Sequence, residues 1–209
     1  MDLEPKEWIA RVFGQADHES LTRLGGICQP DQPTLLRLIE VFENPATLLA
    51  PYSDEALGQA FWDLSNEAFP AVYDLAIDWT LRDRFISSFE ILFREFFAAR
   101  CTPTLGHLSQ ERSALNIACY MWWDFNCWSP DPDPLTRNPN DSAFLESMRS
   151  ILTIDHVACQ ESALHGLGHW RHAHNATVES IIDEFLKKER NLSEPLRKYA
   201  GDARRGCVQ

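Results

Sequence analysis

Large apolar side chains recur at the spacing of an α-helix through most of this chain, and this pattern limits the fold more than any other feature. The segment 82–100 shows it best, because its apolar residues fall on one helical stripe: Phe85, Ile86, Phe89, Leu92, Phe93, Phe96 and Phe97. The chain contains no Asn-Gly or Asp-Gly turn and no alternating run of β-branched residues, which would indicate β-hairpins. We therefore predict an all-α protein with about 9–11 helices.

Capping residues and prolines divide the chain into these helices. Ser53 precedes two acidic residues and predicts a helix start, and Ser109, Asp141 and Asp155 are expected to cap later helices. The segment 128–140 holds four prolines and cannot be helical, so we expect one long loop there. Long loops in compact domains are often functional, although this one can equally span a wide gap between helices.

The composition fits one folded domain and points away from nucleic acid. The chain has 209 residues, of which 44% are hydrophobic, so we predict a single domain over residues 1–209. Its net charge is −12, with 31 acidic against 19 basic residues. This balance lacks the basic stripe of nucleic-acid-binding proteins and suits a basic protein partner.

The sequence also leads us to expect a cytoplasmic protein with no membrane contact. No run reaches the roughly 18 consecutive apolar residues that a membrane-spanning helix needs. The residues from Met1 to Glu7 are acidic and polar, unlike a signal peptide. The six cysteines are scattered and form no Cys-x-x-Cys pair, as in proteins that keep their thiols reduced.

The second half of the chain contains an internal repeat. Residues 111–120 and 160–169 align without gaps at an offset of 49 residues and share Ser-Ala-Leu. Residues 155–189 combine a first helix with Ala-Leu-x-Gly-Leu-Gly, a polar turn at 171–175 and a second helix with Val-x-x-Ile-Ile-x-x-Phe-Leu, which resembles a HEAT repeat. The resemblance implies HEAT-like helical hairpins stacked in a short right-handed α-solenoid, repeat-like over 108–209 and less regular over 1–107. An irregular helical bundle is the alternative fold.

A row of possible metal ligands lies on the helix predicted around residue 165. Glu161, His165 and His169 are spaced at i, i+4 and i+8, so they share one face, and imidazole and carboxylate are ligands of zinc and iron. The spacing is not His-Glu-x-x-His, however, and two glycines loosen the helix between the histidines. The HEAT-like deoxyhypusine hydroxylases hold two irons with His-Glu pairs, whereas Gln160-Glu161 lacks that histidine. We therefore predict no cofactor and keep a metal-dependent enzyme or ligand-binding scaffold at these three residues as the alternative.

Nucleophilic catalysis has less support. Cys159 lies three residues after His156 near a predicted helix start, which lowers the pKa of a thiol, but no third orienting residue is evident. The chain has no Gly-x-Ser-x-Gly elbow and no phosphate-binding glycine loop. The sequence alone therefore predicts a protein that is not an enzyme.

An aromatic run beside the proline-rich loop provides candidate interface residues. Trp122 and Trp123 are adjacent and so point to different helix faces, and Trp128 follows them. Tryptophan is favoured at the centre of protein interfaces. With Asp131 and Asp133 steering a basic partner, we predict these five residues as partner contacts.

A small, acidic, all-helical chain without a catalytic signature is similar in profile to bacterial immunity proteins, which neutralise a toxin domain in the cytoplasm. This resemblance implies a non-catalytic protein-binding module, an inhibitor of a basic, nuclease-like toxin domain.

Overall fold

The computed structural model describes residues 3–14, 24, 26–108, 113–125, 128–131, 138–189 and 191–208. Within these ranges the chain is helical with connecting turns and contains no β-strand, so the all-α prediction is confirmed. The α-helices are α1 (Pro5–Phe13), α2 (Gln32–Glu43), α3 (Pro45–Leu48), α4 (Asp54–Glu67), α5 (Trp79–Leu92), α6 (Ala98–Arg100), α7 (Ala114–Tyr120), α8 (Pro139–Ile151), α9 (Val157–Lys188) and α10 (Glu194–Arg204). Two 3₁₀ turns, η1 (Phe69–Tyr73) and η3 (Met121–Asp124), and one π-helical turn, η2 (Phe93–Phe97), lie between them.

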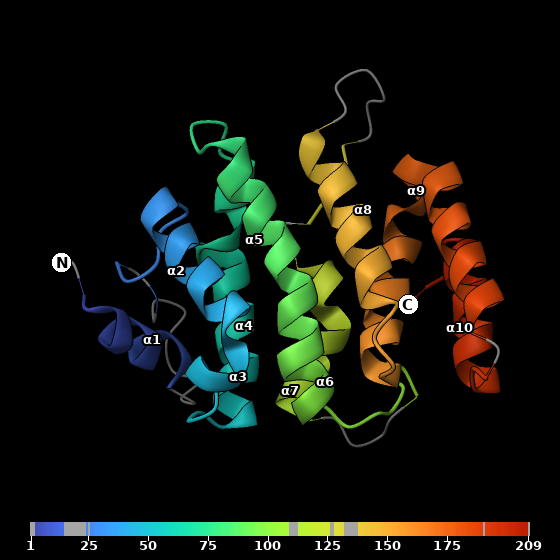
Figure 1. The fold of residues 1–209 in the computed structure, drawn as a ribbon, viewed down its shortest axis with the longest axis horizontal. Helices are drawn as coiled ribbons and strands as arrows, with labels where there is room; N and C mark the ends of the chain where they lie inside the picture. Colours follow the sequence, from blue (N-terminus) through green and yellow to red (C-terminus); the bar gives the residue numbers. More distant parts are fainter. Residues whose placement is uncertain are drawn as a thin grey trace.

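The helices stand side by side in an array that follows the chain from the N-terminus to the C-terminus (Figure 1). One row is formed by α2, α5 and α8, each in contact with the next, and a second row by α4, α7 and α9. At the C-terminal end, α10 packs against α9. No helix among the described residues is long and apolar enough to cross a membrane.

Several helix starts follow from the local sequence. The Ser53 side chain accepts a hydrogen bond from the Ala56 N–H at the start of α4, as predicted. Ser113 caps α7 in the same way, whereas the predicted cap Ser109 lies outside the described residues. Such caps satisfy N–H groups that have no partner inside the helix.

Two predicted caps are corrected. Asn138, not Asp141, caps α8. Proline favours the first helical position, so the helix begins at Pro139, closer to the N-terminus than predicted. Asp141 is then buried within the first turn. Likewise α9 begins after His156 and not at Asp155.

Two segments after residue 70 depart from regular α-helix. The segment from Pro70 forms only the 3₁₀ turn η1, which ends at Tyr73, and Leu75 is left 82% exposed. The helix predicted over 82–100 is present, but its C-terminal part contains the π-helical turn η2. The wider turn of a π-helix shifts the stripe of side chains.

The polar turn predicted at 171–175 contains fewer non-helical residues than expected. In α9 the backbone is non-helical only at His174, with φ −128° and ψ 41°, where two helical segments meet at a kink. The His174 Nε2 is 2.7 Å from a carboxylate oxygen of Asp141 in α8, and its ring stacks on Trp170. These contacts hold the corner against the neighbouring helix.

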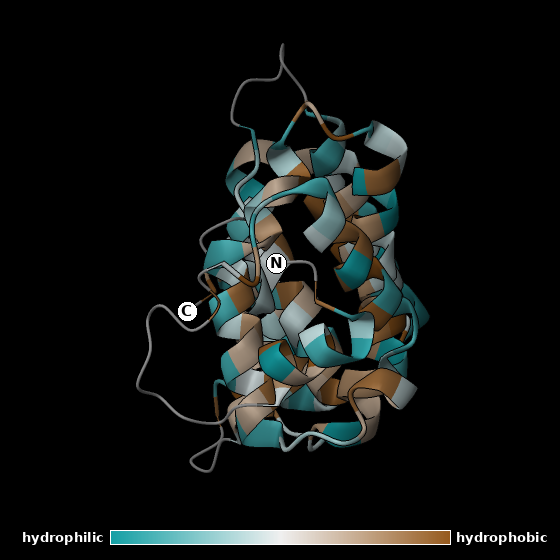
Figure 2. Ribbon diagram, turned by 90° about the vertical axis from the view of Figure 1, so that its left-hand side faces the viewer, coloured by the Kyte–Doolittle hydropathy of each residue, from teal (hydrophilic) through white to brown (hydrophobic). Residues whose placement is uncertain are grey.

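A cluster of aromatic rings fills the space between the two rows. Trp122 is fully buried and contacts seven phenylalanine rings at centroid distances of 5.2–6.1 Å: Phe42, Phe61, Phe69, Phe89, Phe93, Phe97 and Phe125. Aromatic pairs of this kind contribute about 0.5–1.5 kcal/mol each beyond the burial of their area. Hydrophobic and hydrophilic residues alternate around the helices (Figure 2), as the periodicity of the sequence requires.

Candidate functional site

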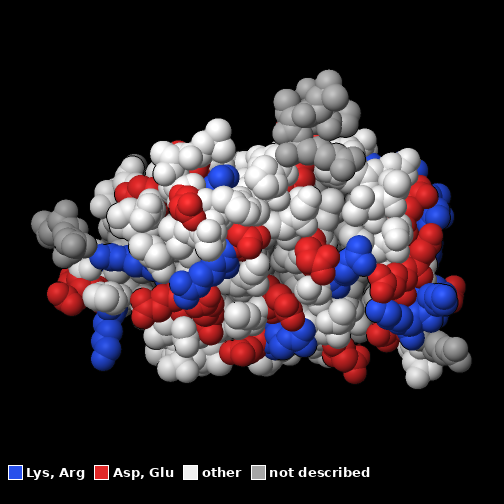
Figure 3. Space-filling view, turned by 45° about the horizontal axis from the view of Figure 1, so that its top comes forward, with Lys and Arg blue, Asp and Glu red and all other residues white. Residues whose placement is uncertain are grey.

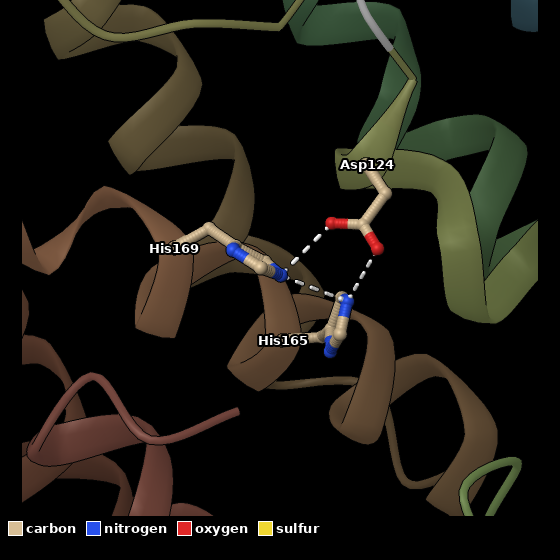
Figure 4. Close-up of side chains that lie close together, drawn as sticks. All are labelled: Asp124, His165 and His169. Atoms are coloured by element: carbon tan, nitrogen blue, oxygen red, sulfur yellow. Dashed lines mark hydrogen bonds and ion pairs between the residues drawn. The ribbon is translucent and has the colours of Figure 1, made fainter. Parts of the chain in front are cut away.

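Two histidines of α9 and one aspartate of η3 meet beside the aromatic core. The His165 Nε2 is 2.9 Å from Asp124 Oδ2, the His169 Nε2 is 2.9 Å from Asp124 Oδ1, and the two Nε2 atoms are 3.2 Å apart (Figure 4). These three ligand atoms all lie within 4.8 Å of one another, an arrangement that can hold a metal ion. Among the described residues, no other group of three His, Cys, Asp or Glu residues converges in this way.

Gly166 explains how η3 comes so close to α9. A Cβ atom at position 166 would lie 2.5 Å from the Cγ of Trp123, far closer than side chains tolerate. With glycine there, the indole of Trp123 rests directly on α9, and the next residue, Asp124, reaches the two histidines. Gly168 likewise leaves room for Val208 of the C-terminal segment. Gly166, one of the two glycines that weaken the metal prediction from sequence, is therefore the residue that lets the third ligand approach.

The cluster of Asp124, His165 and His169 is accessible to solvent on the side of His169. His165 is buried, Asp124 is half-buried, and the side chain of His169 is 44% exposed. Burial by itself raises the pKa of Asp124, but hydrogen bonds from His165 and His169 outweigh burial and hold that pKa well below its usual range. Asp124 is therefore a carboxylate at neutral pH, the form that binds a metal ion.

Tyr199 of α10 supports His165 from the other side of the imidazole. Its hydroxyl lies 2.6 Å from His165 Nδ1 and 3.2 Å from the hydroxyl of Tyr120 in α7. Burial, and then the hydrogen bond with Tyr120, raises the pKa of Tyr199, so that it stays a neutral phenol. A partner on the second ring nitrogen fixes the orientation of a metal-binding histidine.

Glu161, the first residue of the predicted row, is placed in a different group. Its buried carboxylate accepts hydrogen bonds from the backbone N–H groups of Gly106 and His107 and contacts the His107 Nδ1. The predicted ligands thus separate: His165 and His169 join Asp124, and Glu161 joins His107. The cause is the segment before α7, which packs its backbone against the N-terminal part of α9.

A pocket of about 760 Å³ opens beside both groups. It is lined by His107 and Leu108, by Tyr120 and Met121, and by residues of α10 and the C-terminal segment. Tyr120 belongs to the pocket wall and its ring lies 4.5 Å from that of His165. The pocket and the histidine cluster are therefore neighbours that share the hydroxyl pair of Tyr120 and Tyr199.

The three tryptophans among the predicted partner contacts do not lie at the surface, which corrects the expectation from sequence. Trp122, Trp123 and Trp128 are 0, 2 and 4% exposed and belong to the core, so their rings are not available to a partner in this conformation. Adjacent tryptophans can both be buried here because η3 is enclosed by the phenylalanine cluster and by α9. Asp131 is half-buried and donates its N–H to the Asp141 carboxylate, and Asp133 lies outside the described residues.

The Cys159–His156 pair lacks access for a substrate. A hydrogen bond from Cys119 and, after the opposing effect of burial, one from His156 lower the pKa of Cys159 to about 6. The thiol is nevertheless fully buried and faces the Phe93 carbonyl. This pair is therefore a feature of the interior.

Sequence reasoning misses Asp124, His107 and Tyr199. Asp124 carries one signal, since a carboxylate within an aromatic run is costly to bury unless it is paired. His107 and Tyr199 carry none, because they lie 54 and 34 residues away from their partners Glu161 and His165.

No protein-family model matches this chain, and neither a curated protein nor a solved structure matches it significantly. The function must therefore be argued from the geometry of the site.

Proposed function

We propose that this protein binds a divalent transition-metal ion, zinc or iron(II), through Asp124, His165 and His169. The observation that carries the proposal is the convergence of the three ligand atoms within 4.8 Å at a partly exposed position. Two imidazoles and one carboxylate are the ligand set of many catalytic zinc sites and of non-haem iron(II) sites, which leave coordination positions open.

The distances suit a common ion. Ligand atoms about 2.0–2.1 Å from a tetrahedral zinc ion are about 3.3 Å apart, and the two Nε2 atoms here are separated by 3.2 Å. The hydroxyl of Tyr199 on the far nitrogen of His165 supplies the outer hydrogen bond that such ligands usually have.

An ion held by three protein ligands can polarise a carbonyl group or activate a water molecule. The open side next to His169 leaves the remaining positions of the ion accessible. The pocket lined by Tyr120 and Tyr199, whose walls contain none of the three ligands, has room for a small molecule near the site. We therefore favour a metal-dependent enzyme over the non-catalytic protein predicted from sequence. Its scaffold is a short stack of HEAT-like helical hairpins, for which the two rows of contacting helices are the support.

Calorimetric titration of metal-free protein with zinc, and anaerobically with iron(II), tests this proposal. We expect about one ion per chain, and we expect Asp124→Ala and His169→Ala to weaken binding by at least about tenfold, the loss seen even for outer partners of metal ligands. His172→Ala is the matched control, because His172 is exposed on the same helix and lies outside the cluster. Wild-type protein that binds no ion, or variants that bind as tightly as the control, would contradict the proposal.

A second candidate, inhibition of a basic toxin domain in the cytoplasm, is supported by the net charge of −12. On the face shown in Figure 3, however, acidic and basic side chains are interspersed. Affinity capture from lysate at low and moderate salt tests it. One dominant basic partner released by salt would support the inhibitor, and the absence of any partner would remove it.

A further inference from the structure

The wall of the pocket contains His107, which is paired with the buried carboxylate of Glu161 behind it, and the metal site uses neither residue. Glu161 is 1% exposed, and its hydrogen-bond partners among the described residues come from the segment before α7. We infer that His107, oriented by Glu161, acts as the general base in the hydrolysis of a small uncharged ester bound in the pocket. This activity goes beyond the proposed metal site and uses none of its three ligands.

The carboxylate of Glu161 is fixed by three contacts. Its Oε2 accepts a hydrogen bond from the Gly106 N–H at 2.5 Å, and its Oε1 accepts one from the His107 N–H at 3.2 Å and contacts His107 Nδ1. A side-chain Cβ at position 106 would lie 3.3 Å from Oε2, so glycine suits this close approach. Because a carboxylate only accepts, the proton between Glu161 and His107 belongs on Nδ1.

With Nδ1 protonated, Nε2 is the basic nitrogen of His107. No hydrogen bond to Nε2 is found among the described residues. The imidazole is held by stacking on Tyr199, with ring centroids 4.5 Å apart and 21° between the planes. His107 lines the pocket, and its side chain is 25% exposed. A carboxylate that sets the tautomer and orientation of an imidazole is the arrangement of catalytic dyads and triads.

The walls of the pocket indicate the class of substrate. Its apolar surface comes from Leu108, Tyr120, Met121, Pro195 and the ring of Tyr199. Glu194 and Asp202 disfavour an anionic ligand, whereas the ammonium of Lys198 can face a carbonyl oxygen that gains negative charge. An uncharged ester with an aromatic or aliphatic part is the substrate class that best complements these lining residues.

The reaction balances as a hydrolysis. A water molecule gives one proton to His107 Nε2 while its oxygen bonds to the carbonyl carbon, and the carbonyl electron pair moves to the oxygen near Lys198. When that pair returns, the bond to the alcohol oxygen breaks, and the alcohol takes the proton from His107. The products are a carboxylic acid and an alcohol, and the step needs no oxidant or reductant.

Hydrolysis of p-nitrophenyl acetate by chelator-treated protein tests the dyad. His107→Asn keeps a side-chain N–H for Glu161 but has no basic nitrogen, so we expect an unchanged melting temperature and a rate at least about tenfold lower, since general bases contribute roughly 10²–10⁴-fold. Glu161→Gln, at the positioning residue, should lower kcat with little change in KM. His172→Asn, at an exposed histidine, is the control and should keep the wild-type rate.

The outcomes separate this inference from the metal proposal. A rate that survives chelation and His169→Ala but is lost in His107→Asn supports the dyad, even if no metal binds. A rate that persists in His107→Asn, or no rate above buffer, overturns the dyad and leaves the contact with Glu161 as a structural one. A rate that depends on His169 and metal but not on His107 also overturns the dyad and supports the metal site.

Discussion

The helices α5 and α9 both lie inside the array, yet they bury different chemistry. The inward face of α5 is mostly apolar, with Phe85, Ile86, Phe89 and Leu92 in the core. The first half of α9 instead buries four polar side chains that are close together in the sequence: Gln160, Glu161, Ser162 and His165. Each of these four has a hydrogen-bond partner outside its own helix.

The contrast separates the contacts that stabilise the fold from the groups that form the two candidate sites. Apolar contacts of α5 are numerous and need no particular partner atom, so they stabilise the fold collectively. A buried polar group costs free energy unless one specific partner stands at the right distance. The polar face of α9 therefore depends on positions fixed by η3, α10 and the segment before α7, and both candidate sites lie there.

The largest expected effect is on the apolar side of this comparison. Phe89→Ala removes a ring in contact with Phe85 and three tryptophans, so we expect a loss of about 3–5 kcal/mol in the free energy of unfolding, measured with denaturant. Zinc affinity of the folded protein should stay unchanged. Leu36→Ala is the control, because Leu36 is 46% exposed and should change stability little. A loss of zinc affinity without a loss of stability would reverse the roles assigned to the two helices.

The second largest effect is expected where the aromatic core packs against the polar helix α9. Gly166→Ala places a methyl group against Trp123, and we expect a loss of about 1–3 kcal/mol in stability from overpacking. Because Asp124 follows Trp123, zinc affinity should fall as well. Gly201→Ala in α10 is the matched control, since only the end of the Arg205 side chain lies near its added Cβ. If calorimetry gives the same zinc affinity for both variants, Gly166 does not position Asp124.

A smaller effect is expected at the second nitrogen of His165. Tyr199→Phe removes one hydroxyl and keeps the ring that packs against His107, so the fold should persist while zinc affinity drops by about 10–100-fold. Tyr52→Phe, at a tyrosine outside the site, should leave the affinity unchanged. If both variants bind zinc like the wild type, Tyr199 does not orient the ligand.

The smallest effect is a spectroscopic one and compares two buried thiols. Burial, with Glu67 nearby, raises the pKa of Cys28 to about 12, whereas hydrogen bonds from Cys119 and His156 lower that of Cys159 to about 6. Between these values Cys159 is deprotonated and Cys28 is not. Thiolate absorbance near pH 7 should therefore decrease in Cys159→Ser and stay constant in Cys28→Ser, and the opposite pattern would contradict the assignment.

Most of the helical architecture can be predicted from the sequence, because helix periodicity and caps such as Ser53 act over a few residues. The pairing of His165 with His169 is also local, since residues four apart share a helix face. Asp124 and Tyr199 reach these histidines only through packing across 41 and 34 residues, which no local pattern encodes.

The tryptophans illustrate the opposite error. Two adjacent tryptophans on a surface helix cannot both face the core, but η3 is enclosed on both sides. Trp122 meets the phenylalanine cluster, and Trp123 meets Phe144 and the bare backbone of α9 at Gly166. Burial on two sides depends on the arrangement of distant helices, so the sequence alone favours an interface there.

Anomalous X-ray diffraction from crystals grown with zinc would locate the ion relative to Asp124, His165 and His169. We expect one anomalous peak bonded to His165 Nε2, His169 Nε2 and a carboxylate oxygen of Asp124, at about 2.0–2.2 Å from each. A crystal that contains zinc elsewhere on the chain, with His165 and His169 still bonded to Asp124 and no peak between them, would contradict it.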